Sequence, residues 1–544
     1  MLFNSFSFLV FLCLTLAVFA ARPSRWRWAW LLTASLIFYG WLAPSNLLFL
    51  AAIGAAAYGC AWGIGHTPQP WLRRALLTTG LVGVLGALVA FKLYDFVAGE
   101  VEILLRWPAH ALPRLGIAAP AGFSFYAFSA ASYLIDTYAS CARASAADGI
   151  ASSHSRERRA ATPQGRSETH SPAGSLLPAT GTPHRRATRN DTASASLASR
   201  PVPAASLGDI ALYIAWFPKI LAGPIERAPH FLPQLRNGLR LDAVALVPSL
   251  QLIFWGLFKK VVIADNLAPI VDQGFRVAAY ATPVDLLFSV YFFAFQIYCD
   301  FSGYTDIAIG VSQLFGLRLM ENFRRPYLAL STAEFWSQRW HISLAAWFRD
   351  YLFIPLGGSR AGTVRRYLNI MLVFAVSGLW HAGLGYGVGW TFLVWGALNG
   401  FYQWAGIATA GLWRRLGTAL PRVRDGTLLR IARTLLTFHL VLIAWVFFRA
   451  KSIPDALLIL RRLTASVPEL PSMLARFPYT VEQCTGVTLI ALLLVIEILD
   501  ERRPMADRLA RAPVALRWTA YYACLFALLL LGRWQAREFI YMQF

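Results

Sequence analysis

Long apolar runs separated by short polar stretches extend from one end of the chain to the other. They lie at about residues 1–20, 28–42, 43–64, 75–95, 122–138, 207–222, 243–264, 284–316, 365–381, 388–409, 429–448, 483–499 and 516–533. A helix that crosses a bilayer needs about 20 mostly apolar residues, and many of these runs approach that length. The pattern therefore predicts an all-α polytopic membrane protein with about 11–13 transmembrane or re-entrant helices.

Two of the predicted helices carry recognisable start signals. Thr282 precedes Pro283, and proline is favoured at the first helical position because the N–H it lacks has no intrahelical partner there. Ser331 and Glu334 have the spacing of a capping box, in which each side chain bonds to the backbone N–H of the other residue. The second signal predicts a helix through the Trp- and His-rich stretch that follows.

The composition agrees with a lipid bilayer as the surrounding medium. Hydrophobic residues make up 57% of the 544 residues and charged residues 14%, whereas soluble domains carry about 25% charged residues. Short basic loops facing the cytoplasm explain the net charge of +22. Basic and aromatic residues do not interleave outside the apolar runs, so we expect no nucleic-acid partner.

Basic residues also predict the orientation of the chain. Arg22, Arg25 and Arg27 follow the first apolar run rather than precede it, so this run is not a typical signal peptide and the N-terminus is expected outside the cytoplasm. Residues 139–206 then fall on the cytoplasmic side. They are rich in Ser, Ala, Thr and Arg and are predicted to be disordered, because they cannot bury enough apolar surface to offset the entropy of ordering.

Polar residues concentrate between residues 296 and 360, where the apolar pattern predicts membrane or re-entrant helices. A charged side chain at mid-bilayer costs about 2.5–3.5 kcal/mol, so it is normally paired or functional. Ion pairs that hold a re-entrant helix are the favoured interpretation for most members of this polar cluster, and lining a substrate passage is the alternative. The candidates, with one tryptophan further along the chain, are Asp300, Asp306, Asn322, Arg325, Glu334, Trp336, Arg339, Trp340, Arg349, Asp350 and Trp380.

Two histidines stand out from the rest. His341 lies in RWHISL, and His381 lies in SGLWHAG with small residues around it. A neutral imidazole in such a place is suited to act as a general base toward a hydroxyl, and a purely structural hydrogen bond is the alternative. His439 lies in a plain apolar run and is assigned no role. The six cysteines are scattered without ligand spacing, so neither a metal site nor a disulfide framework is expected.

Several of these stretches resemble the membrane-bound O-acyltransferase superfamily, in particular its alginate O-acetyltransferase branch. The resemblance lies in motifs that occur in order through most of the chain. They are AGFSFYAFSAASYLIDTY, WFPKILAGPIERAPHFLPQL, CDFSGYTDIAIGVSQLFGLRLMENFRRPY, EFWSQRWHISLAAWFRDYLFIPLGGSR, SGLWHAG with FLVWGALNG, IAWVFFRA and the terminal FIYMQF.

The resemblance implies a chemistry and a place for it. His381 would be the catalytic base, and His341 would be its partner on the other side of a central tunnel surrounded by helices. The donor would be acetyl-CoA or a similar thioester, with no bound cofactor. The acceptor would be an exported polysaccharide such as alginate, and a periplasmic or membrane-anchored acetyltransferase would be the partner. The protein would lie in the bacterial inner membrane with its N-terminus in the periplasm.

The resemblance also implies how the chain is divided into regions. Residues 1–138 would be N-terminal transmembrane helices, 207–409 the catalytic core, and 410–544 the C-terminal helices. Tyr541, in the terminal FIYMQF, would accept the acyl group as a relay; an interfacial aromatic anchor is the alternative.

Two motifs depart from the family pattern. The first histidine motif usually reads FW-x-R-W-H, whereas this chain has FWSQRWH. On an α-helix the extra residue would turn Trp336 by about 100° relative to His341. The second reads HAG where HGA is commoner, which keeps the site small.

Other functions remain open at the level of the sequence. One is transfer of D-alanyl or another acyl group to a cell-wall polymer, although the length and the terminal tyrosine motif on the same chain argue against D-alanyl transfer. Another is a transporter or scaffold without chemistry. In that case His381 would have no chemical role.

Overall fold

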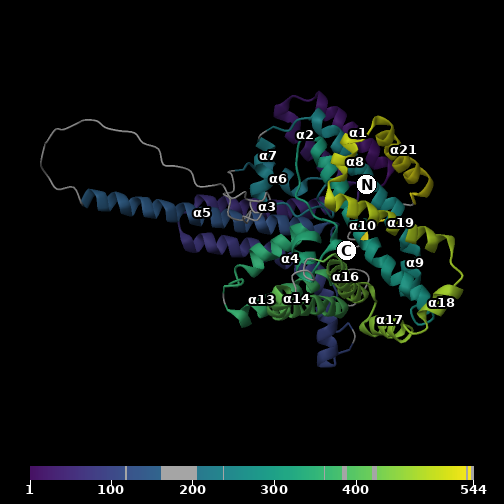
Figure 1. The fold of residues 1–544 in the computed structure, drawn as a ribbon. Coiled ribbons are helices and arrows are strands. Elements are labelled where there is room, and N and C mark those ends of the chain that lie inside the picture. The colour runs from purple at the N-terminus through teal and green to yellow at the C-terminus, as the bar shows by residue number, and fades with distance from the viewer. Residues whose placement is uncertain are drawn as a thin grey trace, which may run out of the picture.

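The computed structural model describes residues 1–108, 110–116, 119–160, 205–236, 238–360, 362–382, 389–419, 426–534 and 537–540, and within them the regular secondary structure is helical. Figure 1 shows the helices gathered around the long helix α10. In chain order the helical elements are α1 (Phe6–Ala21), α2 (Ser24–Gly40), α3 (Asn46–His66), α4 (Pro70–Leu105), α5 (Phe123–Ala160), α6 (Leu207–Ala215), α7 (Ala228–Arg236), α8 (Ala243–Leu257), η2 (Phe258–Ala264), α9 (Asp265–Arg276), α10 (Pro283–Leu314), η3 (Pro326–Leu328), α11 (Thr332–Glu334), η4 (Phe335–Arg339), α12 (Ile342–Phe348), η5 (Arg349–Phe353), α13 (Thr363–His381), α14 (Gly389–Ala419), α16 (Thr427–Arg449), α17 (Ile453–Ala465), α18 (Leu470–Arg476), α19 (Val481–Arg502), α20 (Met505–Arg511) and α21 (Val514–Leu531).

Seven helical stretches in the described residues are long and apolar enough to cross a membrane. They are Asn46–His66, Pro70–Leu105, Ala243–Arg276, Pro283–Leu314, Thr427–Arg449, Val481–Arg502 and Val514–Leu531. The predicted all-α polytopic class is therefore confirmed, and the protein is a multi-pass membrane protein. The elements that carry the two candidate histidines are not among these seven stretches.

Helix α10 is the central element of the fold. It begins as predicted, with Pro283 in its first turn and a reciprocal capping box between Thr282 and Asp285. It packs against α8, α9 and α16. A Cβ at Gly303 would lie only 2.7 Å from the carbonyl oxygen of Gly256, so small residues let α8 and α10 approach closely, as membrane helices often do.

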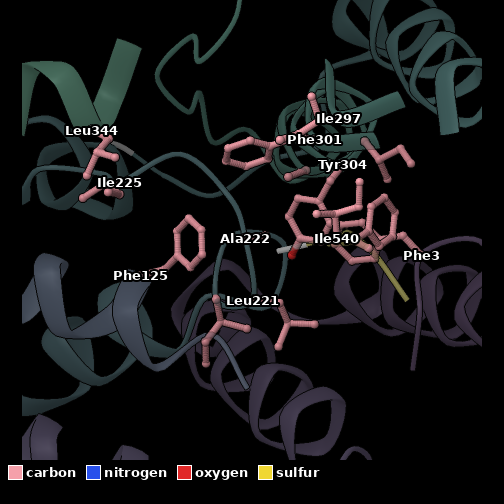
Figure 2. Packing of buried hydrophobic residues seen from close by; sticks show 14 of the residues in the cluster. Phe3, Phe125, Leu221, Ala222, Ile225, Ile297, Phe301, Tyr304, Leu344 and Ile540 are labelled. Atoms are coloured by element: carbon pink, nitrogen blue, oxygen red, sulfur yellow. The ribbon is translucent and has the colours of Figure 1, made fainter. Parts of the chain in front are cut away.

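Aromatic residues from both ends of the chain meet on α10. The ring of Phe3 stacks on Tyr304 at 4.7 Å, and the ring of Phe539 meets Tyr304 edge-on at 4.9 Å. Figure 2 shows Phe3 and Ile540 beside Tyr304, with Phe301 one turn away on the same helix. The C-terminal residues Phe539 and Ile540 are thus part of the buried core.

The apolar run at 207–222 does not form one helix, contrary to the sequence-based expectation. Helix α6 ends at Ala215, and the chain continues without regular structure to α7. Pro218 and Pro224 lie in this stretch, and proline removes the N–H that a continuing helix needs. The loop is buried within the protein, where non-helical backbone at membrane depth is tolerated.

The segment predicted to be disordered, 139–206, begins as a helix instead. Helix α5 continues from Phe123 to Ala160, and residues 161–204 lie outside the described part of the chain. The first part of the segment is rich in Ala and contains Arg and Glu. These residues have high helix propensity and extend a helix that is already nucleated.

Candidate active site

His341 lies at a sharp break between two short helices. The π-helix η4 ends at Arg339, and α12 begins at Ile342. His341 itself adopts a left-handed conformation with φ 44° and ψ 52°, which is uncommon and strained for a residue other than glycine. Such a backbone persists only where the surroundings hold it.

Asn322 holds this break in place. Its carbonyl oxygen accepts the N–H of Ile342 at 2.9 Å. Its side-chain Oδ1 accepts the Ser343 Oγ at 2.9 Å and the Ser343 N–H at 3.3 Å. The Ser343 Oγ in turn accepts the N–H of Ile225 at 3.0 Å. Asn322 and Ser343 are fully buried, so this network fixes the direction in which the His341 side chain leaves the backbone.

The π-helix η4 accommodates the extra residue of FWSQRWH. The N–H of Trp340 bonds to the carbonyl of Phe335, five residues earlier, at 2.8 Å, and a single π-turn absorbs one inserted residue. Trp336 keeps an inward position, because its Nε1 donates to Asn399 at 2.9 Å. Trp340 is buried, with its ring 5.0 Å from Trp445. The extra residue therefore does not turn Trp336 away from the core.

His381 ends α13 and has a defined tautomer. Its Nδ1 lies 2.6 Å from the carbonyl oxygen of Ser377. A carbonyl oxygen only accepts, so Nδ1 carries the proton and the neutral ring keeps its lone pair on Nε2. The imidazole is buried, and its centroid lies 5.0 Å from Trp395 and 5.3 Å from Phe448. This is the protonation pattern that a general base needs.

Close helix packing fixes the end of α13. A Cβ on Gly378 would lie 2.5 Å from the carbonyl oxygen of Phe392, and one on Gly396 would lie 2.5 Å from the carbonyl of Phe374. Only glycine permits α13 and α14 to approach this closely. The small residues around His381 therefore bring two helices into contact.

Trp380 connects the two histidines. Its ring lies 4.5 Å from that of His381 and stacks over that of His341 at 6.4 Å. The ring of Phe301 packs edge-on against His341 at 4.8 Å. Two histidines forty residues apart in the sequence are thus brought to one aromatic cluster, as the prediction of a shared site requires.

A lysine lies against the same cluster. Lys92, from α4, donates to the carbonyl oxygen of Trp380 at 3.4 Å, and its Nζ lies 5.5 Å above the indole ring. Lys92 was not among the predicted site residues. It is the one basic residue between Arg74 and Arg106, and that isolation within an apolar run was the available signal.

The predicted polar cluster does not form one group. Asp300 and Asp306 lie on α10 and pair with two lysines of η2: Lys260 with Asp300, and Lys259 with Asp306, each at 2.7 Å. Both lysines are buried, and neither was among the predicted site residues. The signal was again a basic pair inside the apolar run 243–264.

A second group of the cluster lies at the end of α19. Arg339 bonds to Glu334 at 2.6 Å and to Glu501 at 2.9 Å. Arg325 pairs with Glu501 at 2.6 Å and with Asp500. Burial lowers the pKa of the Arg339 guanidinium, but its hydrogen bonds to Glu501 and Glu334 outweigh that effect and raise the pKa above its usual value. This charged network ties the turn before His341 to α19.

A third group surrounds Asp350. The Arg349 Nε bonds to Asp350 Oδ1 at 2.8 Å with a half-exposed side chain. The buried Arg227 lies 3.6 Å from the other oxygen and 4.2 Å over the ring of Tyr351. Arg227 is a further buried cation that was not among the predicted site residues. The contacts of Arg349 and Asp350 are those of ion pairs.

Of the remaining residues considered in the sequence, the structure describes His439 but not Tyr541. Both ring nitrogens of His439 are engaged, Nδ1 with the carbonyl of Leu435 at 2.7 Å and Nε2 with the hydroxyl of Tyr291 at 2.8 Å. A structural role fits these contacts. Tyr541 lies outside the described residues. In the described part of the chain, no three or more His, Cys, Asp or Glu side chains are grouped to hold a metal ion.

The fold and the site define a helical multi-pass membrane protein with a buried pair of histidines. The model of the membrane-bound O-acyltransferase family matches residues 121–447, which include both histidines. The chain belongs to this family and is an O-acyltransferase.

Named relatives support the family assignment. The chain is 34% identical to the probable alginate O-acetylase AlgI of Azotobacter vinelandii, over 84% of this chain and 76% of that protein. It is 32% identical to the peptidoglycan O-acetyltransferase of Helicobacter pylori, over 79% of this chain and 72% of that protein. It is 26% identical to the teichoic acid D-alanyltransferase of Bacillus subtilis, over 44% of this chain and 60% of that protein.

Proposed function

We propose that the chain moves an acetyl group across the bacterial inner membrane for the O-acetylation of an exported polysaccharide, such as alginate. The donor is acetyl-CoA or a related thioester that enters from the cytoplasm, and the N-terminus lies in the periplasm. Two relatives whose names specify O-acetyl transfer, at 32% and 34% identity, support acetyl as the group. The basic residues after the first apolar run support the orientation.

The observation that carries this proposal is the hydrogen bond from His381 Nδ1 to the Ser377 carbonyl. With the proton on Nδ1, Nε2 is the ring nitrogen whose lone pair would take the proton of an acceptor hydroxyl. The acceptor oxygen then attacks the carbonyl carbon of the thioester, the C–S bond breaks, and the thiolate leaves and takes up the proton. A thioester is already activated, so the protein supplies a base and a site from which water is excluded.

His341 is proposed as the partner of His381 on the other side of Trp380. The stacking of Trp380 over His341 and its contact with His381 support a shared reaction space. A tunnel that opens to both membrane faces at this point stays a prediction. Its donor side would face the cytoplasm, and its acceptor side the periplasm.

The acyl group is proposed to leave by way of a second acceptor. Tyr541 would receive it as an ester, and a periplasmic or membrane-anchored acetyltransferase would pass it to the polymer. The burial of Phe539 and Ile540 next to α10 supports this, because these residues come shortly before Tyr541 in the sequence and are packed in the core. A tail that served only as an interfacial anchor would lie at the membrane surface.

Transfer of D-alanine to a cell-wall polymer is the second candidate. The relative from Bacillus subtilis favours it, but that similarity is 26% over 44% of this chain. The O-acetyl relatives match over much more of the chain at higher identity. Acetyl transfer is therefore the better supported reaction.

Purified protein in nanodiscs tests the proposed function. One sample receives acetyl-CoA labelled in the acetyl group, and a second receives a carrier-protein thioester of labelled D-alanine, each with a soluble oligosaccharide acceptor. Ester-linked acetyl label on the protein or acceptor supports the proposal. Label from D-alanine alone would replace it with the second candidate. In sealed vesicles, passage of intact donor without ester formation would indicate a transporter and overturn both.

A further inference from the structure

The last described residues of the chain lie inside the helical core. The backbone N–H of Ile540 donates to Asp300 Oδ2 at 2.7 Å. Phe539 is 1% exposed and Ile540 4% exposed. Residues 538–540, here called the C-terminal segment, therefore enter between α10 and η2.

One buried ion pair contacts the whole C-terminal segment. Asp300 accepts from Ile540 with one oxygen and from Lys260 Nζ, at 2.7 Å, with the other. The same Lys260 Nζ lies 4.6 Å from the ring centroid of Phe539 and 3.5 Å from the carbonyl oxygen of Glu538. A second carboxylate, Asp265, lies 3.0 Å from Lys260. Two side chains thus engage three consecutive backbone or ring groups of the segment.

Stability alone does not account for this pair. A charge inside an apolar span is costly, and replacing a buried ion pair by apolar residues of similar volume is often neutral or stabilising. Lys260 and Asp300 provide what apolar residues cannot: an acceptor for the N–H of Ile540, and a cation for the carbonyl of Glu538 and the ring of Phe539. Lys260 also lies on the π-helix η2, and π-turns are frequent at functional sites.

The pair also lies next to the candidate active site. Phe301 follows Asp300 on α10, and its ring is 4.8 Å from that of His341. Figure 2 shows Ile540 beside Tyr304, one turn of α10 from Phe301.

We propose that Lys260 and Asp300 are positioning residues that dock the C-terminal segment next to the histidine site, and that acetyl transfer depends on this docking. Docking itself follows from the contacts of residues 538–540. The dependence of acetyl transfer on docking rests on the proposed function, in which Tyr541 is the acyl acceptor.

The neighbouring ion pair provides a matched control. Lys259 and Asp306 lie on the same two elements, η2 and α10, and pair at the same 2.7 Å with Lys259 buried. Among the described residues, no hydrogen bond or ion pair joins either of them to residues 537–540. Replacing this control pair removes a comparable charge pair without touching the contacts of the segment.

Amide hydrogen exchange of the full-length protein in nanodiscs, read by mass spectrometry on the C-terminal peptide, measures docking. The variants are Lys260→Met with Asp300→Leu, and Lys259→Met with Asp306→Leu as the control. A hydrogen bond to a charged acceptor contributes a factor of about ten or more, so the first variant should exchange at least about tenfold faster at Ile540. The control should exchange at the wild-type rate. Unchanged exchange in the first variant, or equal acceleration in both, overturns the docking site.

A third variant distinguishes loss of docking from a general loss of folding. Phe539→Ala removes the ring that Lys260 and Tyr304 contact, at the very end of the described chain, and should also accelerate exchange of the peptide. Acetyl transfer is measured on the same samples and should fall in both docking variants. Faster exchange with wild-type transfer overturns the positioning role. Inactive wild-type protein whose peptide is protected would instead overturn the proposed function and leave docking supported.

Discussion

The indole of Trp380 stacks over the imidazole of His341, with 6.4 Å between the ring centroids and 27° between the ring planes. The same indole meets its chain neighbour His381 edge-on at 4.5 Å. The spacing of the two histidines therefore depends on one large side chain at the end of α13.

Two replacements of Trp380 test its contribution to the stability of the protein and to the alignment of the two histidines. Trp380→Ala removes a large buried ring, for which we expect a loss of about 3–5 kcal/mol in stability and loss of acetyl transfer. Trp380→Phe keeps an aromatic contact and should lose less of both. Thermal unfolding in detergent and acetyl transfer in nanodiscs measure the two quantities. Wild-type transfer by Trp380→Ala would show that the indole does not align the site.

The left-handed backbone of His341 predicts an unequal response to two substitutions. His341→Ala and His341→Asn both remove the imidazole, but asparagine tolerates φ 44° better than alanine. We expect the asparagine variant to be more stable by about 1 kcal/mol. Chemical unfolding of the two variants, compared side by side, gives this difference. Equal midpoints would mean that the turn relaxes once histidine is absent.

The contact between α13 and α14 predicts that Gly378 cannot accept a methyl group. In Gly378→Ala the new Cβ meets the carbonyl oxygen of Phe392 at 2.5 Å, so the helices must separate. Overpacking of this kind costs about 1–3 kcal/mol, and the movement should also lower acetyl transfer.

Gly406, on the neighbouring helix α14, is the control for that variant. A Cβ there meets nothing within 4 Å. Gly406→Ala should be neutral or more stable by about 0.5–1 kcal/mol, because alanine favours a helix interior. Thermal unfolding of both variants tests the pair of predictions. Similar losses of stability in the two variants would show that close packing does not set Gly378 apart.

The proposed acyl relay predicts a specific effect of Tyr541→Phe. This change keeps an aromatic ring for anchoring and removes only the hydroxyl that would carry the ester. Ester-linked acetyl on the purified protein should disappear, and acetylation of the polymer in cells should fall. Mass spectrometry of the C-terminal peptide after reaction detects the ester. Unchanged polymer acetylation would end the relay hypothesis and leave the anchor interpretation.

The apolar pattern predicted the membrane spans because each span is a run of consecutive apolar residues. Helix α10 and its cap at Thr282 followed directly from local sequence. The same local logic failed at 207–222, where the helix ends at Ala215, shortly before Pro218, although the run stays apolar. Hydropathy indicates that a segment is buried, and here part of the buried segment is a loop rather than a helix.

The site was predictable only in part, because its geometry comes from contacts between distant segments. The two histidines stood out by their surroundings, but no local signal places Trp380 between them. Lys259 and Lys260 obeyed the same rule that singled out Asp300, a charge within an apolar run. Their pairing with α10, about 40 residues away, is a tertiary fact. The π-turn that absorbs the extra residue of FWSQRWH is equally invisible in the sequence.

The most direct test of the central claim is the single-turnover rate of acetyl transfer by His381→Ala in nanodiscs, measured with and without added imidazole. His439→Ala, which removes a structural histidine, is the control. If His381 Nε2 is the general base, the first variant should lose about 10²–10⁴-fold in rate, recover part of it with imidazole, and differ clearly from the control. Transfer by His381→Ala at the wild-type rate would contradict the account.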